Sequence, residues 1–417
     1  MAGLYIHIPF CKSRCIYCGF YSTTLHSLRA RYVDALCREM ELRSITGNPL
    51  DSRASISTIY LGGGTPSQLN AHELNQIFDS IYRVYQVEDS AEITMECNPD
   101  DLAPNTQTHP FSDAFSDSKN PSYVEILSQL PINRISLGIQ TFSDNRLQFL
   151  HRRHTACQAK EAIRLLRAVG FKNISIDLMF GFPDETIDEW QYDIDQALQL
   201  DVEHISAYSL MYEEGTPLFE MRAKSISEDL SLAMYHLLID RLTAAGYEHY
   251  EISNFAKTTH SVSAPLSSRL VKVEKSSPTY YSYRSRHNSS YWHGVPYIGI
   301  GAAAHSFDID SRYWNVSDVR QYIQSIENGE LPVDEKEILS VSEKYDDMVM
   351  TALRTKEGIN LEQVLNRFGT DYHDYLLKNA SPYLNSQMLT LNDTNQLRLT
   401  EKGLFVSDSI MSDLMYV

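Results

Sequence analysis

The sequence predicts an α/β protein: a partial barrel of six strand–helix units, followed by a small α+β domain. Three observations predict it. Short apolar runs alternate with amphipathic stretches over the first two-thirds of the 417 residues. From about residue 340, the pattern changes to three helices, a hairpin and a helix. Hydrophobic residues make up 43% of the chain, which is ordinary for a folded protein.

The strand–helix alternation is regular enough to place each element. Six apolar runs are predicted to be strands, at residues 4–8, 58–61, 92–96, 134–138, 175–179 and 204–210. Between them, apolar residues recur every three or four positions at 29–42, 71–84, 157–169 and 187–198, which is the helical period. Such alternation predicts a parallel sheet covered by helices. Six units are two fewer than in a closed barrel of this type, where function lies at the carboxyl ends of the strands.

Three regions depart from the alternation. Residues 104–121 are rich in Ser, Asp, Asn and Pro and are expected to form an exposed loop, and residues 257–283 form a Ser-rich insertion. After residue 340, a turn at 392–395 separates two short strands, and the whole resembles a winged-helix domain. We therefore predict a barrel at 1–235, an intermediate region at 236–335 and a C-terminal winged-helix-like domain at 336–417.

Charge and composition exclude several classes of protein. The formal net charge is -18, with 54 Asp and Glu against 36 Lys and Arg. Nucleic-acid binding needs basic surface to displace counterions, so no nucleic-acid partner is expected. No apolar run approaches the roughly 20 residues that span a bilayer, and no signal peptide is evident. Six cysteines without a disulfide pattern indicate a reducing compartment, and we expect a cytoplasmic protein.

Cys11, Cys15 and Cys18 lie together on the loop that follows the first predicted strand. Three thiolates can hold an iron–sulfur cube and leave one iron for an outside ligand. The alternative is a zinc-stabilised barrel with a structural role, in which His7 or His26 is the fourth ligand. Zinc loops usually pair two C-x2-C arms, and the chain has no second arm. The remaining cysteines, Cys37, Cys97 and Cys157, are isolated and are expected to be ordinary buried thiols.

A glycine-rich segment, residues 62–67, follows the second predicted strand and reads Gly-Gly-Gly-Thr-Pro-Ser. Glycines permit positive φ and a close approach of the backbone to a ligand. Backbone N–H groups in such a segment can bind a carboxylate. A Gly triplet alone is more often a turn. Its position after a strand and downstream of the cysteines favours a ligand-binding segment.

Four polar residues accompany later strands: Glu96, Gln140, Arg152 and Asp177. A polar side chain inside an apolar strand is costly to bury without a partner. The four can satisfy one another, for example Asp177 with Arg152, or they can surround a polar ligand. Because all four are expected on one rim of the barrel, we favour a ligand.

The motifs together resemble a known family. The cysteine spacing, with an aromatic residue before the last Cys, resembles the radical S-adenosylmethionine (SAM) superfamily. Residues 5–10, 62–67, 133–142, 177–183, 206–217 and 250–254 are similar to the family of oxygen-independent coproporphyrinogen III oxidase and its relative, the heme chaperone HemW. The resemblance implies a TIM-type partial barrel and a [4Fe-4S] cluster on Cys11, Cys15 and Cys18. It implies SAM contacts from Tyr5, Gly63, Gly64, Thr65, Glu96, Gln140, Arg152 and Asp177.

Two departures from the oxidase pattern favour the chaperone branch. The oxidase has a further Cys two positions after the third, where this chain has Phe20, and a longer segment before the cluster loop, where this chain has ten residues. The chaperone branch also has a His-Asn-x-x-Tyr-Trp motif, present here at 287–292. His is a common heme ligand, so His287 is predicted to bind heme, and a structural His is the alternative.

The resemblance therefore implies a heme chaperone that binds heme, a [4Fe-4S] cluster and SAM. Its partners would be a heme-acceptor protein and, if SAM is cleaved, an electron donor. Oxidase activity on coproporphyrinogen III is not expected. The alternative function is that oxidase, which decarboxylates two propionate side chains by radical SAM chemistry.

Overall fold

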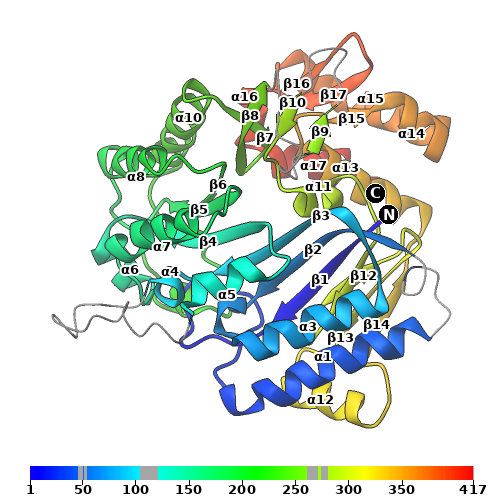
Figure 1. Ribbon diagram of the computed structural model, residues 1–417. Helices are drawn as coiled ribbons and strands as arrows, with labels where there is room; N and C mark the ends of the chain where they lie inside the picture. The colour runs from blue at the N-terminus through cyan, green and yellow to red at the C-terminus, as the bar shows by residue number, and fades with distance from the viewer. Residues whose placement is uncertain (46–49, 51–53, 104–120, 261–270, 274–279, 417) are drawn as a thin grey trace.

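A curved sheet of parallel strands is the centre of the molecule (Figure 1). The computed structural model describes residues 1–45, 50, 54–103, 121–260, 271–273 and 280–416. The six predicted strands are confirmed as β1 (Ala2–Ile8), β2 (Ser55–Gly63), β3 (Gln86–Cys97), β4 (Arg134–Gln140), β5 (Ile174–Phe180) and β6 (His204–Ser209). They lie in chain order, each parallel to the next. Parallel neighbours of this kind need crossover connections, which here contain helices.

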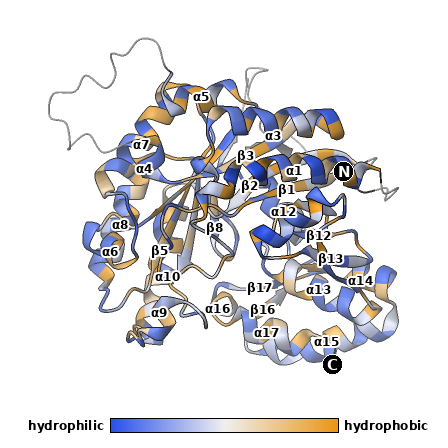
Figure 2. Cartoon of the chain, turned by 90° about the horizontal axis from the view of Figure 1, so that it is seen from below, coloured by the Kyte–Doolittle hydropathy of each residue, from blue (hydrophilic) through white to orange (hydrophobic). Residues whose placement is uncertain are grey.

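Helices cover the outer face of this sheet. The predicted helices are confirmed as α1 (Arg29–Ser44), α3 (Ala71–Val84), α7 (Ala156–Ala168) and α8 (Ile187–Gln199), joined by α5 (Tyr123–Gln129) and α10 (Glu228–Ala244). Short helical turns connect them at η1 (His26–Leu28), η2 (Pro66–Gln68), α4 (Pro99–Leu102), α6 (Asp144–Phe149) and α9 (Pro217–Glu220). Hydrophilic and hydrophobic residues alternate along the outer helices, as amphipathic packing requires (Figure 2).

The start of α3 shows how the sequence fixes these helices. Asn70 accepts a hydrogen bond from the Glu73 N–H at 3.0 Å, and the Glu73 carboxylate accepts one from the Asn70 N–H at 2.8 Å. This capping box satisfies two backbone donors that would otherwise lack partners. The same arrangement begins α7 and α8.

Further strands extend the sheet at both edges, and the sequence did not predict them. On one side, β11 (Tyr297–Ile300) is parallel to β1, and β12 (His305–Phe307), β13 (Ser311–Asn315) and β14 (Val333–Ile338) continue antiparallel. On the other side, β8 (Asn254–His260) is antiparallel to β6 and is joined by β7 (Tyr247–Glu251), β10 (Tyr280–Ser282) and β9 (Val271–Val273). α12 (Val319–Glu327) packs beside α1. All eight of these strands have only three to seven residues, and they do not alternate regularly with helices, so they lack the pattern that identified β1–β6.

The two faces of the parallel strands differ in polarity. Along β5, Ile174, Ile176 and Leu178 are buried in the core beneath the helices. Ser175 and Asp177, at the intervening positions, line a cavity on the inner face. Successive side chains of a strand point to opposite faces, so the period of two separates an apolar exterior from a polar interior.

The C-terminal domain has its own hydrophobic core, built around Tyr345, Val349, Leu376 and Leu397. It consists of α13 (Val341–Leu353), α14 (Leu361–Phe368), α15 (Thr370–Asn385), the hairpin β16 (Leu389–Leu391) and β17 (Gln396–Leu399), α16 (Glu401–Leu404) and α17 (Ser407–Leu414). The predicted order of helices and hairpin is confirmed, and a short strand β15 (Ile359–Asn360) completes a three-stranded sheet. The proposed boundary at 335/336 falls inside β14, and the one at 235/236 falls inside α10.

The two predicted insertions lie mostly outside the described residues. Residues 104–120 are not described, and of 257–283 only the strand segments of β8, β9 and β10 and residue 283 are. Among the described residues, no helix combines the length and apolarity needed to cross a membrane. Cys37 and Cys97 are buried as expected, but Cys157 is exposed because it lies in the first turn of α7 on the solvent side.

Candidate functional site

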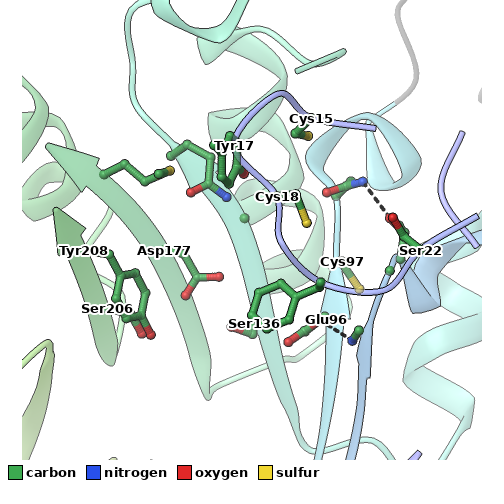
Figure 3. A pocket seen from close by; sticks show the side chains of 18 of the residues that line it. Cys15, Tyr17, Cys18, Ser22, Glu96, Cys97, Ser136, Asp177, Ser206 and Tyr208 are labelled. Carbon is green, nitrogen blue, oxygen red and sulfur yellow. Dashed lines mark hydrogen bonds between the residues drawn. The ribbon is translucent and has the colours of Figure 1, made fainter. Parts of the chain in front are cut away.

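A cavity of about 590 Å³ lies inside the curved sheet, at the carboxyl ends of its parallel strands (Figure 3). Most of the predicted site residues line it: Cys11, Cys15, Cys18, Gly63, Gly64, Thr65, Glu96, Gln140, Arg152 and Asp177. Tyr5 and His287, predicted with them, do not. The structure therefore brings together side chains from five different strands and the cysteine loop, as expected for the active end of a barrel.

The cysteine loop runs between β1 and η1 and is fixed at several points. The Cys11 N–H donates to the Thr23 carbonyl oxygen at 2.9 Å, and the Cys11 thiol lies 3.3 Å from the Thr65 hydroxyl. The Cys15 sulfur accepts a hydrogen bond from Arg152 Nη1 at 3.7 Å. Burial raises the pKa of the Cys11 and Cys18 thiols. A metal centre would reverse this effect, because metal-bound thiols lose their protons.

The donor set fits a centre with an unfilled position better than a closed zinc site. Within the described residues, no group of three or more His, Cys, Asp and Glu side chains stands close enough together to hold a metal ion without rearrangement. His7 donates Nε2–H to the Tyr21 carbonyl oxygen at 3.0 Å, and its Nδ1 accepts from Tyr5 at 3.0 Å. His26 binds the Cys11 carbonyl oxygen through Nε2 at 3.2 Å. Neither His is therefore placed as a fourth ligand, and three thiols remain on one cavity wall.

Two N–H groups of the glycine segment already have partners within the protein. Gly63 N–H donates to Glu96 Oε2 at 3.1 Å, and Gly64 N–H donates to the Ile8 carbonyl oxygen at 2.8 Å. The glycines also permit close packing. A Cβ on Gly64 would lie 2.6 Å from the Pro9 carbonyl carbon, and Gly63 has φ +107°. The segment therefore holds the end of β1, from which the cysteine loop departs.

Two partly buried carboxyl groups, those of Glu96 and Asp177, line the cavity. Glu96 accepts hydrogen bonds from Tyr60 at 2.7 Å and from Gly63 N–H. Burial, reinforced by the charge of Asp177, raises the pKa of Glu96 from 4.5 to about 7. Burial likewise raises the pKa of Asp177 to about 6, against the opposing effect of Ser206 and nearby guanidinium groups. Figure 3 shows Asp177 beside Ser206 and Tyr208. Such groups favour a cationic or hydroxyl-bearing ligand.

Gln140 and Arg152 share the space beside Gly138. Gln140 has φ +71°, and the β4–β5 register shifts between Gly138 and Gln140. A Cβ on Gly138 would lie 2.9 Å from the Gln140 side-chain nitrogen and 3.1 Å from Arg152 Nη2, so any larger residue would displace these two side chains. Arg152 Nη2 donates to the Gly138 carbonyl oxygen at 2.6 Å. No salt bridge joins Arg152 to Asp177 among the described residues, so the pairing that was the alternative to a ligand is not formed.

Asn98 is a site residue that the sequence analysis missed. Its Oδ1 accepts a hydrogen bond from Arg152 Nη2 at 2.8 Å, and its Nδ2 donates to the Thr65 hydroxyl at 3.3 Å. Asn98 precedes Pro99 at the start of α4, where Asn usually caps the helix, but it makes no side-chain capping bond. Its place two residues after Glu96, at the end of β3, was the available signal.

His287 does not present itself as a heme ligand. It is 2% exposed, its Nδ1 is hydrogen-bonded to Thr58 at 2.9 Å, and its Nε2 is hydrogen-bonded to Tyr291 at 2.8 Å. Its ring stacks against Tyr60 at 5.0 Å, and burial lowers its pKa to about 3. Tyr5 stacks behind Tyr60 at 6.3 Å. Because both ring nitrogens are engaged in hydrogen bonds, the geometry favours the structural role that was the alternative for His287.

Comparison with known proteins agrees with this geometry. Residues 5–197 match the radical SAM superfamily, and residues 339–406 match the HemN C-terminal domain. The chain is 30% identical to the heme chaperone HemW of Bacillus subtilis over 98% of each protein, and 29% identical to that of Lactococcus lactis over 99% of this chain and 96% of the relative. It is 32% identical to the Escherichia coli HemW over 73% of this chain and 69% of the relative.

A solved structure shares the fold. Coproporphyrinogen III oxidase (HemN) from Escherichia coli superposes with a TM-score of 0.78 over 99% of this chain and 90% of that one, at 19% identity. This likeness establishes the architecture, including the arrangement of barrel and C-terminal domain, while the full-length sequence similarity identifies the branch. The chain belongs to the HemW family of the radical SAM superfamily.

Proposed function

We propose that this protein is a heme chaperone, which binds heme and delivers it to an acceptor protein. The observation that carries the proposal is the 30% identity to a heme chaperone over 98% of both chains. The likeness to the oxidase rests on a shared fold at 19% identity. Phe20, which replaces the additional cysteine of the oxidase pattern, is 71% exposed beside the cavity.

The chaperone would hold two cofactors in the barrel. Cys11, Cys15 and Cys18 would bind a [4Fe-4S] cluster, with one iron left for SAM. Arg152 and Thr65, which contact the sulfur atoms of Cys15 and Cys11, would fix the loop and moderate the charge on the thiolates. Such a cluster supplies one-electron chemistry at low potential when it is reduced.

The chain's own residues prepare the rest of the cavity for SAM. The carboxyl groups of Glu96 and Asp177 suit ribose hydroxyls or a cationic group, and they are held by Tyr60 and Ser206. Gln140 would orient the nucleoside by hydrogen bonds from its amide. The location in the cytoplasm stays a prediction from cysteine usage.

The experiment that tests the proposal compares heme binding with oxidase activity in one preparation. The protein is reconstituted anaerobically with iron and sulfide, titrated with heme, and incubated with SAM, a reductant and coproporphyrinogen III. We expect stoichiometric heme binding and no protoporphyrinogen. Sustained conversion of coproporphyrinogen would establish the oxidase instead, and a protein that binds no heme would not be a heme chaperone.

A further inference from the structure

A second cavity, of about 580 Å³, lies between the barrel and the C-terminal domain. Its walls come from α11 (Arg286–Trp292) and the loop after it, from β12 and β13, and from α13 and α14. None of the residues that line it lines the barrel cavity. Its volume falls in the range of sites that enclose a small molecule or cofactor.

One short helix separates the two cavities. α11 carries the His-Asn-x-x-Tyr-Trp motif and packs against both β2 and α13 (Figure 1). Near its start, Ser285 and Asn288 line the barrel cavity, and at its end Tyr291 and Trp292 line the second cavity. α11 therefore contributes residues to both cavities, and its C-terminal end lies at the second cavity.

The second cavity has aromatic walls. Tyr291 and Tyr297 meet edge to face with ring centroids 4.6 Å apart, and Phe307 lies 6.0 Å beyond Tyr297. Trp292 and Phe368 contribute two more rings. The Trp292 indole nitrogen is buried and lacks a hydrogen-bond partner among the described residues. Aromatic side chains of this kind suit a large, flat and mostly apolar ligand.

Charged side chains of both signs stand at the edge of this cavity, and Asp347 and Glu357 supply the negative ones. Arg312, Lys344 and Arg367 all line it. Arg312 pairs with Asp347 and Glu337, each at 3.3 Å, and Lys344 pairs with Asp310 at 2.6 Å, so both charges are neutralised. Arg367 makes no salt bridge with any described residue and lies over the Phe368 ring at 5.0 Å. Guanidinium groups at an apolar cavity edge suit the carboxylates of an amphipathic ligand.

His293, the residue directly after the motif, is arranged as a metal ligand. It is exposed and lines the second cavity. Its Nδ1 lies 2.6 Å from the Ser289 carbonyl oxygen, which can only accept, so Nδ1 carries the proton. The neutral ring therefore has its lone pair on Nε2. Metal-binding His residues commonly have this arrangement, in which a carbonyl holds the other ring nitrogen.

We propose that the second cavity is the heme site, with His293 Nε2 as an axial ligand of the iron. The aromatic walls would enclose the porphyrin, and Arg367 would bind a propionate. This inference rests on the proposed heme-chaperone function. It assigns the iron-ligating role to His293, at the exposed end of α11, in place of the buried His287.

Heme titration of the full-length protein tests the assignment, with ferric heme and metal-free protoporphyrin as separate probes. His293→Ala should weaken heme binding at least about tenfold, the loss that even an outer partner of a metal ligand causes, and should shift the Soret band. Its affinity for protoporphyrin should stay unchanged, because that probe has no iron. Arg367→Glu should lower the affinity for both probes about two- to fivefold. His72→Ala, on an exposed His of α3, serves as the matched control.

The outcomes separate the two proposals. Heme binding by the wild type that neither His293→Ala nor Arg367→Glu alters would overturn the site assignment and leave the chaperone function standing. Failure of the wild type to bind heme would overturn both. Both substituted side chains are exposed, so folding is expected to be unaffected, and circular dichroism of each variant checks this.

Discussion

Glu96 should make the metal-free protein less stable as the pH rises. Burial raises the pKa of Glu96 from 4.5 to about 7. Between these values the folded chain holds a proton that the unfolded chain has lost, so the free energy of unfolding falls with increasing pH. The stabilisation is complete below about pH 4.5 and disappears as the pH passes about 7.

The size of the effect follows from the pKa values. A difference of 7 - 4.5 = 2.5 units corresponds to about 3 kcal/mol at 1.36 kcal/mol per unit. Between about pH 5.5 and about pH 8, the free energy of unfolding should fall by about 2 kcal/mol through this group. Glu96→Gln keeps an acceptor for the Tyr60 hydroxyl but does not titrate. The difference in unfolding free energy, variant minus wild type, should therefore grow by about 2 kcal/mol over that range.

Urea unfolding of the reduced, metal-free protein provides the assay. Trp190 is fully buried on α8 in the barrel and reports barrel unfolding, with Trp292 and Trp314 replaced by Phe in every sample. Glu335→Gln, at an exposed position of β14, is the control and should show a pH-independent difference. A pH-independent difference for Glu96→Gln as well would refute the raised pKa assigned to Glu96.

Three further substitutions test the site. His287→Ala leaves two buried hydroxyl partners unsatisfied at about 1–3 kcal/mol each, so chemical denaturation should show a loss of about 2–6 kcal/mol, while His287→Gln should lose less. Gly64→Ala forces a Cβ against Pro9 and should lower stability by about 1–3 kcal/mol and reduce the iron content after reconstitution, measured colorimetrically. Asn98→Ala frees Arg152 and should weaken SAM binding about two- to tenfold in calorimetry with iron content unchanged; unaltered affinity would remove Asn98 from the site.

Much of the barrel could be predicted because its pattern is local. β5 shows why: apolar Ile174, Ile176 and Leu178 alternate with polar Ser175 and Asp177, so the strand and its two faces are both visible in the sequence. The edge strands β11–β14 could not be predicted in this way. Their pairing joins segments far apart in the chain, such as β1 with β11, and short strands carry little periodicity.

The site shows the same division between local and non-local information. Residue types at strand ends identified Glu96 and Asp177 as members of the cavity. The sequence could not show that the Gly63 and Gly64 N–H groups are already bonded, because their partners lie on β3 and β1. Nor could the sequence show that His287 Nδ1 is hydrogen-bonded to Thr58 of β2. A motif indicates which residues matter, whereas their hydrogen-bond partners decide what each can do.

Iron and sulfide analysis after anaerobic reconstitution tests most directly whether the three-cysteine loop holds an iron–sulfur cube. Wild-type protein should contain about four iron and about four sulfide per chain and should be brown, whereas Cys15→Ser should lose the cluster. A wild-type protein that stays colourless and retains zinc instead, or a Cys15→Ser variant with a full cluster, would contradict this ligand assignment.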